Sequence, residues 1–215
     1  MKTDQTCSHD IQLADLDLYA LFIRLLEKPM SGKDALVVDE RLPAILTEVA
    51  DYLGLPSYPA VLPPGSPQDA QSAYLSLFEV GFPAPPCPLN ESPYNRSEPP
   101  TKLIRENLLF YRAFGLDLSP ENLELPDHIS NQLEFLSYLT RLAEQSANPD
   151  AIESIRAGKR DFIERHVLFW VPKARQKLAE LDDMLYEPIF GLLVECLRVD
   201  LDTHRLSGDR EMRSR

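Results

Sequence analysis

Imidazole, carboxylate and thiol groups are the side chains of this sequence that could perform acid–base chemistry or bind a metal. The four histidines are His9, His128, His166 and His204, and none lies at the His-x-x-x-His, His-Glu-x-x-His or Glu-x-x-His spacing of helical metal sites. The sequence also lacks a Gly-x-Ser-x-Gly nucleophile elbow, a P-loop and a Rossmann fingerprint. It therefore predicts no catalytic residue, no metal site and no cofactor.

One short segment concentrates the groups that could bind a ligand. Glu124, Pro126, Asp127 and His128 lie within five residues, where a helix is expected to begin. In a structural interpretation, Pro126 and Asp127 are first-turn residues, and the carboxylate satisfies free N–H groups of the helix. In a functional interpretation, Asp127 and His128 form a polar cluster at the mouth of a groove that receives a basic peptide. The pattern alone leaves both interpretations open.

The composition restricts the possible partners. The chain has 215 residues with 22 Lys and Arg against 34 Asp and Glu, which gives a formal net charge of −12. Because phosphate binding requires clustered cations, we expect no nucleic-acid partner. The 19 prolines exceed the 8 glycines, which disfavours turn-rich β folds and Gly-rich phosphate loops. No apolar run approaches the roughly 20 residues that cross a bilayer, so we expect no membrane span.

Cysteine usage and the start of the chain predict the compartment. Cys7, Cys87 and Cys196 are odd in number and far apart, which is typical of a reducing cytoplasm. Residues 1–10 contain charged side chains and no long apolar run, so they are not expected to act as a signal peptide. We therefore expect a cytoplasmic protein that is not exported by itself.

Apolar residues recur at steps of three and four along most of the chain, and no stretch alternates cleanly enough to predict a strand. We therefore expect an all-α fold, in the form of a single globular multi-helix bundle. Ser66 and Pro67 form a helix-start signal, Gly115 suits a helix end, Gly158 is a weak point and Pro172 kinks or restarts a helix. The expected helices cover residues 11–27, 42–53, 66–78, 101–114, 126–144, 151–171 and 183–201.

A Pro-rich region interrupts the helices. Residues 56–100 hold 12 of the 19 prolines, which excludes a regular helix or a central strand over most of this region. We expect a long extended loop with a hinge at about residues 80–100. Its apolar residues are expected to pack on a groove, and they are Phe82, Cys87, Leu89 and Tyr94. The expected organisation is a flexible N-terminus at 1–10, a helical domain at 11–202 and a disordered basic tail at 203–215.

Five short motifs follow one another in a fixed order between residues 74 and 172, and the resemblance to which they belong covers about residues 16–201. They are an aromatic-x-x-Leu-Phe, a Pro-rich loop with a Ser and an aromatic residue, an aromatic-x-x-x-Gly-Leu, a Pro-Asp-His helix start and a His-x-x-x-Trp-x-Pro. Together they resemble the TorD/DmsD/NarJ family of redox-enzyme maturation chaperones. Cys87 departs from the family pattern, because many members have Trp there. The motifs read Tyr74-x-x-Leu77-Phe78, Pro85-Pro86 through Ser92-Pro93-Tyr94, Tyr111-x-x-x-Gly115-Leu116, Glu124-Leu125-Pro126-Asp127-His128 and His166-x-x-x-Trp170-Val171-Pro172.

The resemblance implies an all-helical, TorD-like protein that is not an enzyme. It would bind the twin-arginine leader and/or the apo form of the catalytic subunit of a molybdopterin oxidoreductase of the DMSO-reductase type. It would hold this subunit in the cytoplasm until the molybdenum cofactor is inserted and before export. Helical members of this kind are expected as monomers or domain-swapped dimers. The leader-binding residues that the resemblance implies are Tyr74, Leu77, Phe78, Pro86, Ser92, Tyr94, Glu124, Pro126, Asp127 and His128.

The charge of the chain suits this expected partner. A twin-arginine leader combines two Arg with an apolar stretch, so its partner needs carboxylates beside a hydrophobic groove, and Asp127 and Glu124 could pair with the guanidinium groups. Two alternatives stay open. One is a metal-dependent helical hydrolase that uses Asp127 and His128, and the other is a structural subunit of the oxidoreductase complex.

Overall fold

The computed structural model describes residues 17–30, 35–56, 58, 66–119 and 123–212, and these residues form helices with no strand among them. This finding confirms the all-α prediction. None of the described helices is both long enough and apolar enough to cross a membrane. The α-helices are α1 (Leu18–Leu25), α2 (Leu42–Tyr52), α3 (Pro67–Tyr74), α4 (Pro100–Ala113), α5 (Ile129–Gln145), α6 (Pro149–Phe162), α7 (Leu168–Glu180) and α8 (Tyr186–Met212).

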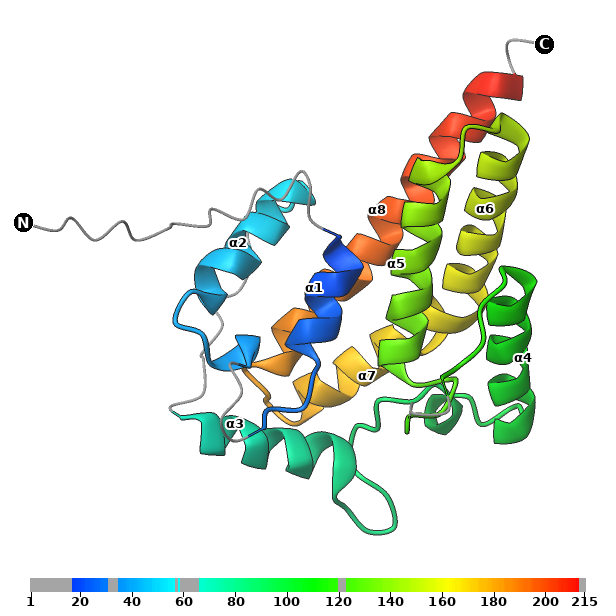
Figure 1. Cartoon of the computed structure of the whole chain (residues 1–215). Helices are drawn as coiled ribbons and strands as arrows, with labels where there is room; N and C mark the ends of the chain where they lie inside the picture. Colours follow the sequence, from blue (N-terminus) through cyan, green and yellow to red (C-terminus); the bar gives the residue numbers. More distant parts are fainter. Residues whose placement is uncertain (1–16, 31–34, 57, 59–65, 120–122, 213–215) are drawn as a thin grey trace, which may run out of the picture.

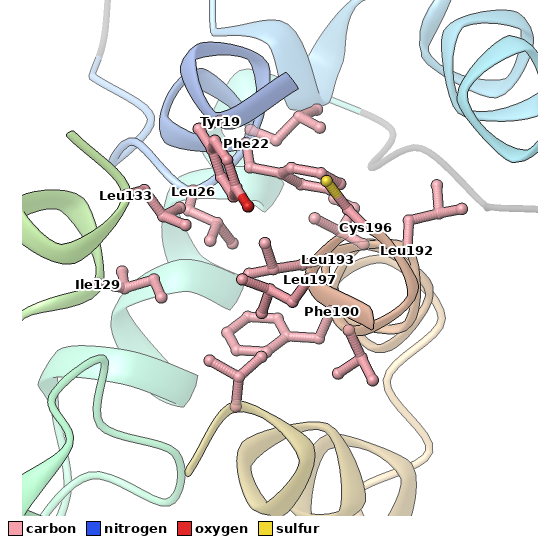
Figure 2. Close-up of a cluster of buried hydrophobic side chains, with 14 of the residues drawn as sticks. Tyr19, Phe22, Leu26, Ile129, Leu133, Phe190, Leu192, Leu193, Cys196 and Leu197 are labelled. Atoms are coloured by element: carbon pink, nitrogen blue, oxygen red, sulfur yellow. The ribbon is translucent and has the colours of Figure 1, made fainter. Parts of the chain in front are cut away.

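The helices enclose one apolar core in which α8 is central. Helix α8 contacts α1, α2, α6 and α7, and α5 contacts both α1 and α6. Figure 1 shows α5, α6 and α8 running beside one another, with α2 and α3 on one side and α4 on the other. In Figure 2, helices α1, α5 and α8 direct buried side chains toward one another, among them Tyr19, Phe22, Leu26, Ile129, Leu133, Phe190, Leu193 and Leu197.

Local sequence signals set several helix ends as predicted. Ser66 is the N-cap of α3, where its Oγ accepts a hydrogen bond from the backbone N–H three residues on, and Pro67 is the first residue of the helix. Gly115 follows α4 with φ +79°, the left-handed conformation expected at a helix end. The predicted N-terminal segment at 1–10 lies outside the described residues.

The later helices differ from the prediction in detail. Helix α6 continues through Gly158, where a Cβ would lie only 2.3 Å from the ring of Phe114, so the missing side chain permits this close approach. The chain changes direction near the π-helical turn at Ile163–Val167, between α6 and α7, rather than at Pro172, which lies inside α7 (Figure 1). Helix α8 continues to Met212, well beyond its predicted end.

The Pro-rich loop before α4 packs on the core through part of its length. Cys87 and Leu89 are buried and Tyr94, in a short 3₁₀ turn, is half-buried, so packing is confirmed at these three residues. The N–H of Cys87 donates to the Leu77 carbonyl at 2.9 Å, which ties the loop to the end of the preceding helical segment.

The prediction that Phe82 packs on a groove is wrong, because its side chain is fully exposed, at 101%. The reason lies in the turn that carries it. A Cβ on Gly81 would lie 2.4 Å from the Ala84 carbonyl oxygen and 2.7 Å from the Cα of Pro85. The loop therefore folds back tightly on its own backbone, and Phe82 is left on the outside of the turn.

Candidate functional site

The Pro-rich loop and the linker that precedes α5 are joined by backbone hydrogen bonds. The N–H of Glu91 donates to the Asp127 carbonyl at 3.0 Å, and the N–H of Ile129 donates to the Leu89 carbonyl at 2.8 Å. Two motifs that are more than thirty residues apart in the sequence are thus neighbours in space. The candidate site is built around this junction.

Asp127 holds the two segments together with its side chain. It is fully buried, and its carboxylate accepts hydrogen bonds from the Ser92 N–H at 3.0 Å and the Asn90 side-chain amide at 3.2 Å. The carboxylate therefore serves the Pro-rich loop, and it is not a first-turn group. Helix α5 begins at Ile129 and not at Pro126, because His128 in extended conformation is its N-cap, which corrects the predicted helix boundary.

His128 is the N-cap of α5. Its Nδ1 accepts a hydrogen bond from the Ser130 N–H at 3.3 Å, while Nε2 lies 3.7 Å from Glu124 Oε2. Burial lowers the pKa of His128, and the carboxylates of Glu124, Asp127 and Glu79 oppose this shift without cancelling it. Because Nδ1 acts as an acceptor, the neutral ring carries its proton on Nε2, which faces Glu124.

The aromatic residues of the first motif pack toward α8. The ring centroids of Tyr74 and Phe78 are 5.0 Å apart, and Phe78 lies 4.8 Å from Tyr186, in edge-to-face arrangements. Tyr74 and Phe78 are buried, and Leu77 on the same helical segment is partly buried. These residues join α3 to α8, and they lie beneath the surface rather than on it.

Three carboxylates from different segments influence the Tyr74 hydroxyl. Burial raises the pKa of this hydroxyl, and the carboxylates of Glu79, Glu124 and Glu27 raise it further. Lys28 pairs with Glu79 at 2.6 Å, and both side chains are exposed. We call Glu27, Glu79 and Glu124 the acidic patch. The Lys28–Glu79 pair joins the end of α1 to the end of the α3 segment, and Glu124 and Glu79 both influence the buried imidazole of His128.

Exposed apolar side chains flank the acidic patch along the chain. Leu123 and Leu125 lie on either side of Glu124 and are 95% and 52% exposed. Phe82 follows Glu79 by three residues on the exposed turn of the Pro-rich loop. Scattered apolar residues are normal on protein surfaces, but here they accompany carboxylates on two segments that meet at one place.

A buried polar network lies below the loop junction. The carboxylate of Glu91 accepts hydrogen bonds from Asn107 at 3.0 Å, Gln132 at 2.9 Å and His166 Nδ1 at 3.0 Å. Gln132 in turn accepts a hydrogen bond from Trp170 Nε1 at 2.9 Å. All five side chains are buried, and the network links the Pro-rich loop to α4, α5 and α7, although His166 Nε2 has no hydrogen-bond partner among the described residues.

Sequence reasoning did not single out Glu91, Asn107 or Gln132. The sequence does contain a signal that Asn107 is buried, because Asn107 lies four residues after Leu103 and four before Tyr111, on a face of α4 that is otherwise apolar. A polar residue at such a position needs a buried partner. His166 and Trp170, which belong to the last of the five motifs, are both buried.

The remaining predicted leader-binding residues lie in the Pro-rich loop and in the linker before α5. The Tyr94 hydroxyl donates to Cys87 Sγ at 3.2 Å, and the Tyr94 ring stacks on Trp170 with centroids 5.4 Å apart. Pro126 is buried, and its carbonyl accepts the Tyr111 hydroxyl at 2.7 Å. Pro86 is exposed on the loop. The structure therefore joins the Pro-rich loop, the Tyr111 motif, the Pro-Asp-His motif and Trp170 through direct contacts.

The arrangement of these side chains is suited to binding a ligand. Asp127 and His128 are engaged in hydrogen bonds that fix the loop and the start of α5, and the described residues contain no group of three His, Cys, Asp or Glu side chains placed to hold a metal ion. Carboxylates beside exposed apolar side chains are suited to a ligand that carries both cationic and apolar groups.

Comparison with known proteins identifies relatives of this chain. Residues 38–176 match the family model described as nitrate reductase delta subunit. The perchlorate reductase assembly chaperone protein of Dechloromonas aromatica (strain RCB) is 28% identical over 80% of this chain and 76% of its own length. The selenate reductase assembly chaperone protein of Thauera selenatis is 35% identical over 60% and 68%, and the chlorate reductase assembly chaperone protein of Ideonella dechloratans is 35% identical over 67% and 74%.

Proposed function

Because the nitrate reductase delta subunit model spans residues 38–176, the chain belongs to that family, and we propose that it assists the assembly of a molybdenum-dependent reductase. It is an assembly chaperone rather than an enzyme, as are the perchlorate, selenate and chlorate reductase chaperones that it resembles. In this proposal it binds the twin-arginine leader and/or the apo form of the catalytic subunit in the cytoplasm. It releases the subunit for export after the molybdenum cofactor has been inserted.

The acidic patch is the observation that carries leader binding. A leader with two adjacent Arg presents two planar guanidinium groups, each of which can form a bidentate pair with a carboxylate. Glu124 supplies an exposed carboxylate, Glu79 supplies a second one that also pairs with Lys28, and Leu123, Leu125 and Phe82 supply apolar contact for the residues that follow the arginines. The net charge of −12 accelerates encounter with a basic peptide and makes it dependent on salt.

The predicted leader-binding residues divide into two groups in this proposal. Glu124 and Pro86 are exposed and contact the leader, whereas His128 is only 8% exposed and caps the start of α5. The buried residues do not contact the leader but hold the leader-binding segments in place. Asp127 does so by fixing the linker that carries Glu124. The other residues with a supporting role are Tyr74, Leu77, Phe78, Ser92, Tyr94 and Pro126.

Titration calorimetry with leader peptides tests the proposal. The peptides come from the molybdenum oxidoreductases of the same genome, each as an Arg-Arg and a Lys-Lys version. We expect one Arg-Arg peptide to bind, and its Lys-Lys version to bind more weakly, because Lys lacks the bidentate fork.

Two variants of equal charge locate the site. Glu124→Gln should weaken binding of the Arg-Arg peptide about 10-fold, the loss of one charge-assisted pair. Glu144→Gln removes the same charge from an exposed position at the far end of α5 and should have little effect. If no peptide binds to the folded protein, or if the two variants behave alike, the proposed leader site is wrong.

A further inference from the structure

The acidic patch is already in contact with a cation of the chain itself. Lys28 lies three residues after the end of α1, and its Nζ is 2.6 Å from Oε2 of Glu79, the last residue of the π-helical turn that follows α3. The two residues are 51 positions apart in the sequence, and Figure 1 shows the chain running from the end of α1 to the α3 segment. One carboxylate that the leader is proposed to use is therefore paired before the leader arrives.

The backbone holds Lys28 at this place without the help of the ion pair. Leu26 and Pro29, on either side of Lys28, are buried, and so is Phe78, the residue before Glu79. The side chains of Lys28 and Glu79 are 36% and 40% exposed, and solvent weakens an ion pair at such a position. The pair can therefore form and break while the backbone on both sides stays in place.

Glu124, the other carboxylate proposed to bind the leader, has a different neighbour. Its Oε2 lies 3.7 Å from Nε2 of His128, and burial lowers the pKa of that imidazole, which favours the neutral ring. A neutral ring does not compete with an incoming cation for the carboxylate. The two carboxylates thus differ, because a leader arginine must displace a cation at Glu79 but not at Glu124.

The other charges at the end of α1 do not remove this difference. Glu27, beside Lys28, adds a third carboxylate, so the acidic patch stays negative and attracts a basic leader. Arg24 lies four residues before Lys28. Its charge adds to the hydrogen bonds from Arg41 that lower the pKa of Asp39, a carboxyl outside the patch.

Exchange at Glu79 favours arginine over lysine. A leader Lys that displaced Lys28 would replace one ammonium–carboxylate pair by another, so it would gain almost nothing from Glu79. A leader Arg replaces the single ammonium contact by a bidentate guanidinium pair, which is stronger and fixed in geometry. The guanidinium group therefore gains from this carboxylate and the ammonium group does not.

We propose that Lys28 is a built-in competitor of the leader, displaced from Glu79 by one arginine of the pair, and that this exchange sets the requirement for Arg. The inference rests on the function proposed above, because it assigns Glu79 to a leader arginine. A peptide with Lys in place of Arg leaves the Lys28–Glu79 pair intact and binds through Glu124 alone.

Titration calorimetry of three variants with the Arg-Arg and Lys-Lys peptides tests this proposal. Glu79→Gln should weaken the Arg-Arg peptide about 3-fold and leave the Lys-Lys peptide unchanged. Lys28→Ala should strengthen both peptides about 3-fold, because neither then displaces a cation. Lys28→Arg keeps the charge and gives the competitor the same fork as the leader, so it should weaken the Arg-Arg peptide about 3-fold.

Two further variants separate the ion pair from charge in general. Lys102 forms a similar exposed pair with Glu98 at 2.8 Å at the start of α4, so Lys102→Ala is the matched control and should change neither peptide. The double variant Lys28→Ala/Glu79→Gln should bind both peptides as Glu79→Gln does, because Lys28 acts through Glu79. An equal gain from Lys28→Ala with and without Glu79 would show that its charge alone opposes the leader, and the proposed exchange would be wrong.

The result for Lys28→Arg distinguishes this inference from leader binding itself. If this variant binds the Arg-Arg peptide as tightly as wild type does, the exchange at Glu79 is wrong while leader binding stands. If no peptide binds to wild type, to Lys28→Ala or to Lys28→Arg, all of them folded by circular dichroism, both proposals are wrong.

Discussion

Glu91 and Glu124 belong to the two segments that meet at the candidate site, yet their surroundings are opposite. The Glu91 carboxylate is completely buried and accepts hydrogen bonds from Asn107, Gln132 and His166. The Glu124 side chain is 56% exposed, next to two exposed leucines. The same functional group thus fixes the architecture in one place and offers charge to a partner in the other. Burial and partners, rather than residue type, decide which role a carboxylate has.

Replacing the buried carboxylate should have the largest effect. Glu91→Ala leaves three buried polar side chains without their common acceptor, so we expect a loss of about 3–5 kcal/mol in the free energy of unfolding. Urea denaturation followed by circular dichroism measures this change. Glu124→Ala is the comparison and should leave the urea midpoint almost unchanged. Equal losses in the two variants would refute this division of roles between the two carboxylates.

The contact between α4 and the linker should have an intermediate effect. Tyr111→Phe removes the hydroxyl that donates to the Pro126 carbonyl at 2.7 Å and leaves that buried acceptor without its donor. We expect a loss of about 1–2 kcal/mol in unfolding free energy. Tyr138→Phe, which removes a more exposed hydroxyl bond to the Phe114 carbonyl, should lose less in the same denaturation assay.

His128 should make stability depend on pH. Its pKa is lowered in the folded protein, so near and below the ordinary value of 6.5 the unfolded chain binds more protons than the folded chain. The stability that the neutral ring provides is therefore fully present above about pH 6.5 and is lost as the pH falls through the folded pKa. His128→Asn keeps an N-cap acceptor and removes the titration. The stability difference between wild type and variant should shift with pH in this window, and a constant difference would count against the assignment.

The smallest effect on stability is expected at the exposed turn. Phe82→Ser removes a fully exposed side chain, so thermal unfolding should not change measurably. Leader affinity in calorimetry should nevertheless fall, because Phe82 supplies apolar contact beside the acidic patch. Val80→Ser, at another exposed position of the same turn, is the control. It shows whether the loss of leader affinity is specific to Phe82 or follows the replacement of any exposed apolar side chain by Ser. Unchanged affinity would remove Phe82 from the proposed site.

The helices could be predicted from the sequence because their signals are local. The Ser66 and Pro67 start, the Gly115 end and the apolar steps along α4 depend on neighbours within a few residues. The Pro-rich loop was also predictable as a break in the helices, because prolines act on their own backbone.

The site could be predicted only in part, because its geometry depends on distant partners. Asp127 looked like a first-turn residue, and nothing near it in the sequence indicates that Asn90 and Ser92 bind its carboxylate. Glu91 and Gln132 likewise resemble ordinary surface residues until the loop and α5 are placed together. The resemblance to a known family singled out the segments, but burial in the fold separates supporting residues from exposed ones.

The backbone hydrogen bonds between the Pro-rich loop and the start of α5 also link residues that are far apart in the sequence. They join Glu91 to Asp127 and Leu89 to Ile129 across the whole of α4, so their formation closes a long loop of the chain at a cost in entropy. A copy in which these bonds are broken lacks the arrangement that holds the linker with Glu124. Conversely, a ligand that binds only the folded state raises its stability, so a client-loaded copy should resist proteolysis longer than an empty one.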